Sequence, residues 1–226
     1  MAHPGDSELE LVRRFLRQHA ELYGAEVVLP ASGRGKAAPD PLQAYAEEIR
    51  GCVKCSLGHS RTHFVFGVGN PHARVMLVGE APGADEDRLG EPFVGRAGQL
   101  LNRLLKEAGF EREEVYIANI LKCRPPNNRD PLPTEIALCL PYLQRQIELI
   151  KPDFIVALGR IAAHTLLNTT AALNKLRGVA HGCAGARLIV TYHPAAILRY
   201  PQFEEPTRQD LRLLRRLYDE KYAATR

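Results

Sequence analysis

The sequence predicts an α/β fold of three layers (αβα), with a central parallel sheet of four strands. Four short apolar runs indicate the strands: residues 74–78, 115–120, 154–158 and 188–192. Longer segments with apolar residues at helical spacing separate these runs. Strands that are apolar throughout and alternate with helices are typical of a parallel sheet covered on both faces.

Helices of the compact part are expected over residues 99–108 and 134–150, from residue 160 and from residue 207. A further amphipathic helix is expected over residues 7–23. The sequence PASGRGKAAPDP (30–41) follows it, and its Pro, Gly, Ala and Ser residues favour a flexible linker. We therefore expect two parts, an N-terminal helix with its linker over residues 1–41 and a compact domain over residues 42–226.

Composition and charge restrict the class of protein. No run approaches the ~20 apolar residues of a membrane span, and the N-terminus MAHPGDSELE lacks the pattern of a signal peptide, so a cytoplasmic protein without membrane contact is expected. Residues 151–226 contain 12 Lys or Arg and 6 Asp or Glu. This excess suits a phosphate backbone as partner. A solvated basic helix such as LRLLRRLYDEKY would give the same excess, so both interpretations stay open.

Four of the five cysteines form two spaced pairs. Cys52 and Cys55 make a C-x2-C motif, and Cys123 and Cys139 make a C-x15-C motif. Clustered cysteines in a cytoplasmic protein indicate metal or redox chemistry rather than disulfides. The spacing alone leaves three alternatives: a [4Fe-4S] cluster, a zinc ion, or buried free thiols. Cys183 has no partner in this pattern.

Polar residues follow the predicted strands at the edge where ligands of α/β proteins bind. Glu80 comes directly after the first strand, Asn119 ends the second and His193 follows the last. The turn GEAPG is neither a dinucleotide fingerprint nor a P-loop, so a nucleotide-phosphate site is disfavoured. The acids that follow it, residues 85–87, are either part of the site or the solvated start of a helix. Phe93 lies between two glycines and is either a stacking surface for a base or a small piece of core.

Six motifs together resemble the family 4 uracil-DNA glycosylases, the iron-sulfur branch of the uracil-DNA glycosylase superfamily. They are CVKC, VFGVGNP, GEAPGADEDRLGEPFVGRAGQLLN, VYIANILKCRPPNNRDP, IVALGR and TYHPA, in matching order and spacing over roughly residues 48–200. The resemblance implies a bacterial, monomeric DNA repair enzyme with the fold of that superfamily. It implies hydrolysis of the N-glycosidic bond of uracil in single- or double-stranded DNA, which leaves an abasic site.

The resemblance also implies roles for individual residues. Cys52, Cys55, Cys123 and Cys139 would hold a [4Fe-4S] cluster. The extruded uracil would stack on Phe93, while Asn119 bonds its pyrimidine edge and His193 donates to its O2. Glu80 would orient water and stabilise positive charge on the sugar, and backbone amides near Ala81 and Gly83 would complete the contacts to the base.

Lys175, Arg177 and Arg199 are candidates for contacts to DNA phosphates or to the minor groove, with exposed solubilising charge as the alternative. Ala81 and Gly83 stand where the best-known uracil glycosylases carry a water-orienting Asp and a thymine-excluding aromatic residue, so those two tasks are unassigned. The segment KCRPPNNRDP has no histidine that could bond covalently to DNA, so ordinary turnover is expected. Two other classes stay open: an inactive iron-sulfur DNA-binding or polymerase-associated module, and a redox or zinc protein.

Overall fold

The computed structural model describes residues 10, 13, 17 and 40–223. The chain divides into two units, Met1–Pro39 and Asp40–Arg226. Most of the predicted helix over residues 7–23, and the predicted linker up to residue 39, lie outside the described residues. Both stay predictions, and the fold described below is that of the second unit.

A mixed sheet forms the centre of this unit, in the order β1-β3-β2-β4-β6-β5. Its four inner strands pair in parallel: β2 (Val75–Gly79), β3 (Tyr116–Asn119), β4 (Phe154–Leu158) and β6 (Ala186–Thr191). Every residue of β2, β3 and β4 is buried. The four predicted strands are therefore present.

Two edge strands make the sheet larger than predicted. β1 (Val68–Gly69) and β5 (Ala180–Cys183) pair antiparallel with β3 and β6. The prediction of a purely parallel, four-stranded sheet was wrong in this respect. β1 has two residues, one of them glycine, and β5 has the sequence AHGC. β5 contains none of the β-branched or aromatic residues that mark a strand in a sequence, and β1 contains only one, Val68.

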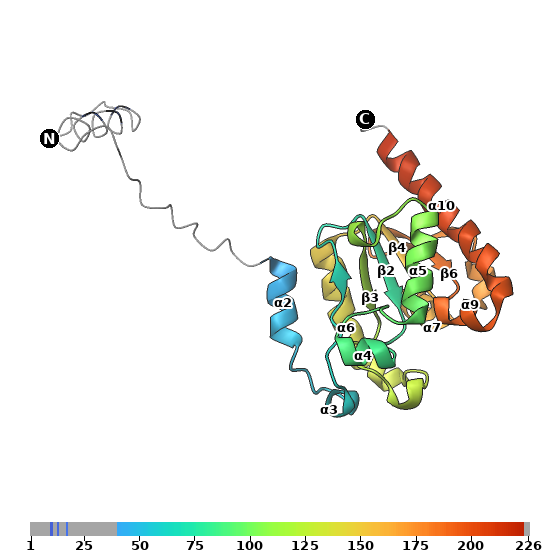
Figure 1. Ribbon diagram of the computed structural model, residues 1–226, viewed down its shortest axis with the longest axis horizontal. Coiled ribbons are helices and arrows are strands. Elements are labelled where there is room, and N and C mark those ends of the chain that lie inside the picture. The colour runs from blue at the N-terminus through green and yellow to red at the C-terminus, as the bar shows by residue number, and fades with distance from the viewer. Residues whose placement is uncertain (1–9, 11–12, 14–16, 18–39, 224–226) are drawn as a thin grey trace. The chain divides into compact units, whose positions relative to one another are not determined.

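Helices cover both faces of the sheet (Figure 1). One core cluster contains Met76 and Val78 of β2 together with residues of α2 (Pro41–Ile49), α6 (Pro133–Ile150) and α7 (Arg160–Leu167). The other contains the alternate residues Val75 and Leu77, with leucines of α5 (Arg96–Glu107) and α10 (Glu204–Ala223). Successive side chains of a strand point to opposite faces. The three-layer α/β fold is thus confirmed.

Shorter elements connect these layers. They are α3 (Leu57–Ser60), α4 (Ala84–Leu89), α8 (Leu173–Leu176), α9 (Pro194–Arg199) and the 3-10 turns Arg112–Glu114, Pro126–Asn128 and Pro201–Phe203. Among the described helices, none combines the length and the apolar character needed to cross a membrane.

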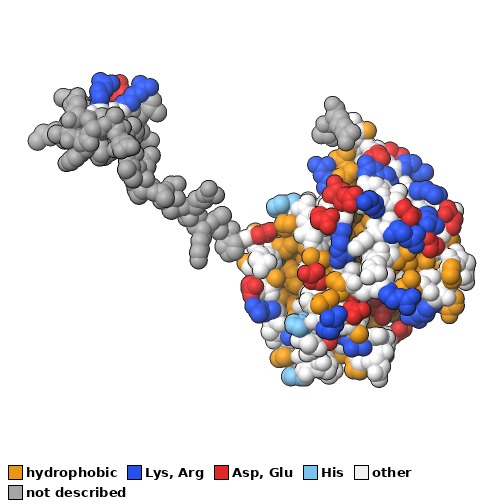
Figure 2. All heavy atoms as spheres, viewed as in Figure 1, with side chains coloured by type: hydrophobic (Ala, Val, Ile, Leu, Met, Phe, Trp, Pro, Cys, Tyr) orange, Lys and Arg blue, Asp and Glu red, His pale blue; other side chains and the backbone are white. Residues whose placement is uncertain are grey.

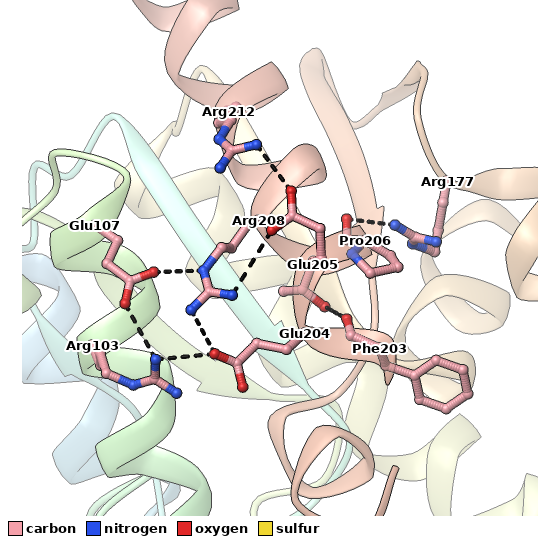
Figure 3. A network of polar contacts seen from close by, with 10 residues as sticks. Arg103, Glu107, Arg177, Phe203, Glu204, Glu205, Pro206, Arg208 and Arg212 are labelled. Carbon is pink, nitrogen blue, oxygen red and sulfur yellow. Dashed lines mark hydrogen bonds and ion pairs between the residues drawn. The ribbon is translucent and has the colours of Figure 1, made fainter. Parts of the chain in front are cut away.

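Ion pairs join α5 to α10 on the outer surface (Figure 3). Arg208 of α10 bonds Glu107 of α5 at 2.8 Å and Glu204 at 2.6 Å, and Arg103 of α5 bonds Glu204 at 3.0 Å. α10 contains five basic and five acidic residues. The basic excess of residues 151–226 therefore lies outside this helix, and Figure 2 shows basic and acidic side chains intermixed on the face in view.

Candidate active site

A cavity of about 510 Å³ lies beyond the carboxyl ends of the parallel strands. Segments that follow β2, β3 and β4 contribute to its wall, as do α9 and the loop before α6. The six residues predicted to contact or act on the base all line it: Glu80, Ala81, Gly83, Phe93, Asn119 and His193. Parallel pairing brings them together although up to 113 positions separate them in the chain.

Phe93 and His193 lie against each other in this cavity. Their ring centroids are 5.5 Å apart and the ring planes are inclined by 32°. Phe93 is 6% exposed and belongs to the core cluster of α5 and α10, so it is both core and cavity wall. Its φ of +54° is rare for an aromatic residue. Gly98 permits this backbone position, because a Cβ there would lie 1.8 Å from the Phe93 carbonyl oxygen.

Asn119 presents an unsatisfied amide oxygen at the end of β3. The residue is 2% exposed, and its Oδ1 has no hydrogen-bond partner among the described residues. Gly79 of the adjacent strand makes room for this group, since a Cβ there would lie 2.3 Å from Oδ1 and 2.7 Å from the Phe93 ring. Because buried polar atoms are nearly always paired, a free acceptor beside an aromatic ring indicates a site for a flat ligand with an N–H donor.

His193 is held as a neutral imidazole with one free donor. It precedes α9, and its Nδ1 accepts a hydrogen bond from the Ala195 N–H at 3.1 Å. The proton of the neutral ring therefore resides on Nε2. Burial lowers the pKa of His193 to about 4; Arg199 lowers it further and Glu86 opposes the shift. Near pH 7 the imidazole is uncharged and donates through Nε2.

Glu80 follows β2 and is half-buried in the cavity wall. Burial raises the pKa of its carboxyl group, the nearby Asp130 raises it further, and Arg160 and Arg199 lower it. Asp130 and Arg160 also line the cavity and form an ion pair of 2.6 Å. Charged groups thus surround the carboxylate at the mouth of the site.

Glu86 braces the two loops of the site, a role that the sequence did not assign. Its carboxylate accepts hydrogen bonds from the N–H groups of Gly83 (3.1 Å), Val94 (2.9 Å) and Gly95 (3.0 Å). The Gly83 N–H thus bonds Glu86 in this structure, and the predicted backbone contacts near Ala81 and Gly83 to a base stay predictions. The spacing of Gly83 and Glu86, helix cap and third helical residue, is the sequence signal that points to this brace.

The other two acids after the GEAPG turn differ in environment. Asp87 is buried and accepts from the Thr62 N–H at 2.9 Å, so it fixes a neighbouring loop. Asp85 is exposed and pairs with Arg88 at 3.4 Å. The solvated-helix interpretation therefore holds for Asp85 but not for Asp87.

The three candidate DNA contacts are placed differently. Arg199 lines the cavity, and Lys175 is exposed on α8 but does not line it. The Arg177 side chain is 13% exposed: its guanidinium bonds Asp210 at 2.7 Å and lies 4.3 Å from the centroid of the Tyr192 ring. Because these groups already engage Arg177, the structure gives it a role in attaching α10 rather than in binding phosphate.

The four cysteines of the two motifs come from different elements. Cys52 and Cys55 lie between α2 and α3, Cys123 follows β3 and Cys139 is in α6. The Tyr142 hydroxyl on α6 donates to Cys52 Sγ at 3.1 Å, which joins the first pair to the second. Cys183 lies elsewhere, with Sγ 3.5 Å from the Leu166 carbonyl oxygen.

Basic and amide groups face these thiols. Arg61 donates to Cys123 Sγ at 3.3 Å and also to the Cys52 carbonyl, and the Lys122 N–H donates to Cys139 Sγ at 3.3 Å. Burial raises the pKa of Cys123 to about 11 and also raises that of Cys139. Within residues 40–223 and the three described N-terminal positions, no three His, Cys, Asp or Glu side chains form a site for a single metal ion.

This geometry defines the class as an α/β protein with a cavity at the carboxyl edge of its sheet, lined by two rings and an unpaired amide oxygen. Residues 66–215 match the family model described as the uracil DNA glycosylase superfamily. A type-4 uracil-DNA glycosylase of Archaeoglobus fulgidus is 45% identical over 192 residues, which cover 80% of this chain and 96% of that protein. The type-4 enzyme of Thermotoga maritima is 46% identical over 160 residues, covering 70% and 83%.

The chain belongs to the type-4 uracil-DNA glycosylases of this superfamily. A DNA polymerase of Bacillus phage SP01 is 34% identical over 156 residues, which cover 69% of this chain but 17% of the polymerase. The type-4 relatives come mostly from archaea, so the bacterial origin expected from the sequence is not supported.

The Glu86 brace can be tested without measuring activity. Glu86→Gln keeps the shape of the side chain but replaces an ionised acceptor of three N–H groups with a neutral amide. Hydrogen bonds to a charged acceptor contribute about 1.5–3 kcal/mol, so we expect faster hydrogen exchange at Val94 and Gly95 and a lower Tm. Asp85→Asn, which alters an exposed acid of the same helix, is the control. Unchanged exchange at Val94 and Gly95 in Glu86→Gln would contradict the brace.

Proposed function

We propose that this chain hydrolyses the N-glycosidic bond between uracil and deoxyribose in DNA and leaves an abasic site for base excision repair. The observation that carries the proposal is the unpaired Oδ1 of Asn119 beside the rings of Phe93 and His193. Membership of the type-4 family supports the same substrate. Cytoplasmic location and a monomeric state remain predictions.

Uracil fits the three groups in the cavity. Its ring would lie on the Phe93 face, its N3–H would donate to Asn119 Oδ1, and its O4 would accept from the Asn119 amide N–H. Cytosine has an acceptor at N3 and an amine at C4. With cytosine bound, both groups of Asn119 would face a group of their own kind. Leaving buried polar groups unpaired costs about 1–3 kcal/mol each, so the amide selects uracil.

His193 and Glu80 would act on the breaking bond from opposite sides. Negative charge develops on the departing base, and the Nε2–H of the neutral imidazole would donate to uracil O2 as that charge forms. Positive charge develops on the sugar, where the Glu80 carboxylate would stabilise it and orient water. Ala81 has no polar side chain, so Glu80 takes this task in the proposal.

The chemistry would stop at the abasic site. Strand cleavage by bifunctional glycosylases needs an amine that forms a Schiff base with the sugar. No lysine is among the residues that the structure places around the cavity. Water is therefore the proposed nucleophile. Arg199, at the cavity, and Lys175, on the surface, are the proposed phosphate contacts.

We further propose that Cys52, Cys55, Cys123 and Cys139 hold a [4Fe-4S] cluster. Each iron of such a cluster takes one thiolate, so the four thiols need not meet at one point as zinc ligands must. Arg61 and the Lys122 N–H donate to two of the sulfurs, which suits thiolates of a negatively charged cluster. The cluster would tie the Cys52–Cys55 segment to α6 and to the loop that forms one wall of the cavity.

The activity is tested with an oligonucleotide that contains one uracil, followed by alkali to cleave abasic sites. Wild-type protein should give a cleaved strand only after alkali. Asn119→Ala and His193→Ala should lower the single-turnover rate by roughly 100-fold, because one preorganised donor contributes about 10²–10³, while DNA binding changes little. Lys106→Ala, an exposed position on α5, is a control outside the cavity. An intact strand with wild type would favour the inactive module.

The pH dependence of the single-turnover rate separates the two titrating groups. Burial and Asp130 raise the pKa of Glu80 above its ordinary value of 4.5. As the pH falls, the Glu80 carboxylate should therefore be protonated, and the rate should decline, while the pH is still above 4.5. The lowered pKa of His193 predicts no change in rate near 6.5, its ordinary value. Glu80→Gln should be slow and lack the acidic limb. An acidic limb near pH 6.5 that persists in Glu80→Gln would exclude the assignment.

Metal analysis tests the cluster. Anaerobically purified protein should be brown and contain iron and acid-labile sulfide in equal amounts, about four of each per chain as the cluster formula requires. Cys139→Ser should lose both, whereas Cys183→Ser should keep both. Stoichiometric zinc without sulfide in the wild type would contradict the assignment.

A further inference from the structure

Lys122 is a buried lysine that the proposed mechanism does not use. Its side chain is 0% exposed, which is rare for a lysine. Its Nζ donates to the backbone carbonyl of Asn119 at 3.0 Å and to Gln146 Oε1 at 2.5 Å. Neither of these two hydrogen-bond partners of the Lys122 ammonium group is a carboxylate. Burying an ammonium group is expensive, so an apolar side chain would fill this volume more favourably.

Gln146 links this lysine by hydrogen bonds to Phe66 and to Tyr116 of β3. It is on α6 and is 0% exposed, and its Nε2 donates to the Phe66 carbonyl at 2.9 Å and to the Tyr116 hydroxyl at 3.2 Å. Its Oε1 is thereby held in place as an acceptor for Lys122. The ammonium group is consequently fixed between α6 and the end of β3.

Asn119 lacks a strand partner on the side where Lys122 lies. β1 pairs with Tyr116 and Ile117 and extends no further along β3. On the other side, the Ile120 N–H bonds the Gly79 carbonyl at 3.0 Å, which fixes the chain to β2. The Asn119 carbonyl belongs to the same trans peptide group as the Ile120 N–H, so it points to the side opposite that bond. Lys122 supplies the donor that a longer β1 would have supplied.

We propose that Lys122 is a positioning residue: its ammonium group holds the Asn119 carbonyl and so fixes the direction in which the Asn119 amide enters the base pocket. Gly79 holds the N–H of the peptide group that follows Asn119, and Lys122 holds its C=O, so this peptide plane is fixed and the Asn119 Cα–Cβ bond has one direction. A displacement of about 1 Å in such a group can lower a rate about 100-fold. The inference rests on the proposed function, because it assigns Asn119 to uracil.

A double-mutant cycle tests the proposal. Lys122→Met keeps the length of the side chain but removes the donor. We expect its single-turnover excision rate to fall at least tenfold, while its affinity for DNA with an abasic-site analogue, which has no base for Asn119, stays within about twofold. In an Asn119→Ala background the same change should alter the rate by less than about twofold, because the group that it positions is gone.

One control variant and one second test variant separate the proposed role of Lys122 from effects on folding and on the cysteines. Tyr116→Phe removes a hydroxyl from the same network without touching Lys122, and it should leave the rate within about twofold of wild type. Gln146→Met removes the second acceptor of Lys122 and leaves the cysteine segments intact. Its rate should fall and should be coupled to Asn119→Ala in the same way, which decides the matter if Lys122→Met does not fold.

Three results would overturn the proposal. They are an unchanged rate in Lys122→Met, a loss that adds fully to that of Asn119→Ala, or a loss of iron and sulfide that accounts for the lost rate. The last would make Lys122 a countercharge for the cysteines. Wild-type protein that excises no uracil would instead contradict the proposed function, so the two failures are distinguishable.

Discussion

The parallel pairing of β2 with β3 is the interaction on which the rest of the site depends. It places Gly79 opposite Asn119, and their ends at the same edge of the sheet. Because Gly79 has no side chain, the Asn119 amide and the Phe93 ring approach the same point. Glu80 follows directly. A shift of this register by one residue would turn Asn119 toward the opposite face of the sheet.

Several features of the site are unfavourable in isolation. The Asn119 oxygen is buried without a partner, Phe93 has a left-handed backbone, and Lys122 is a cation in the core. Strained or unsatisfied groups persist only where their surroundings over-determine them, and they concentrate at functional sites. Here the surroundings are the two core clusters that cover the sheet. The stable interior therefore supports a site that is prepared for its ligand in advance.

Several carboxylates act as internal braces in this protein. Glu86 and Asp87 accept backbone N–H groups, and Glu107 and Glu204 hold α10 against α5 (Figure 3). As a result, much of the charge on α10 is balanced within the protein. Among the described residues, basic groups without a carboxylate partner lie on other segments, such as Arg199, which lines the cavity.

Local patterns in the sequence predicted the four inner strands, the alternation of helices and the convergence of Glu80, Asn119 and His193. These follow from local patterns, since apolar runs mark strands and parallel strands end at one edge. Features that depend on residues far apart in the chain became visible in the folded protein alone. The edge strands β1 and β5 carry little strand signal in their sequences and form because β3 and β6 pair with them. Arg177 is engaged because folding brings it to Asp210, 33 positions away in the chain. The roles of Glu86 and Lys122 likewise depend on hydrogen bonds to particular backbone atoms. The sequence does not specify these partners, because the type of a residue does not determine which atoms lie beside it after folding.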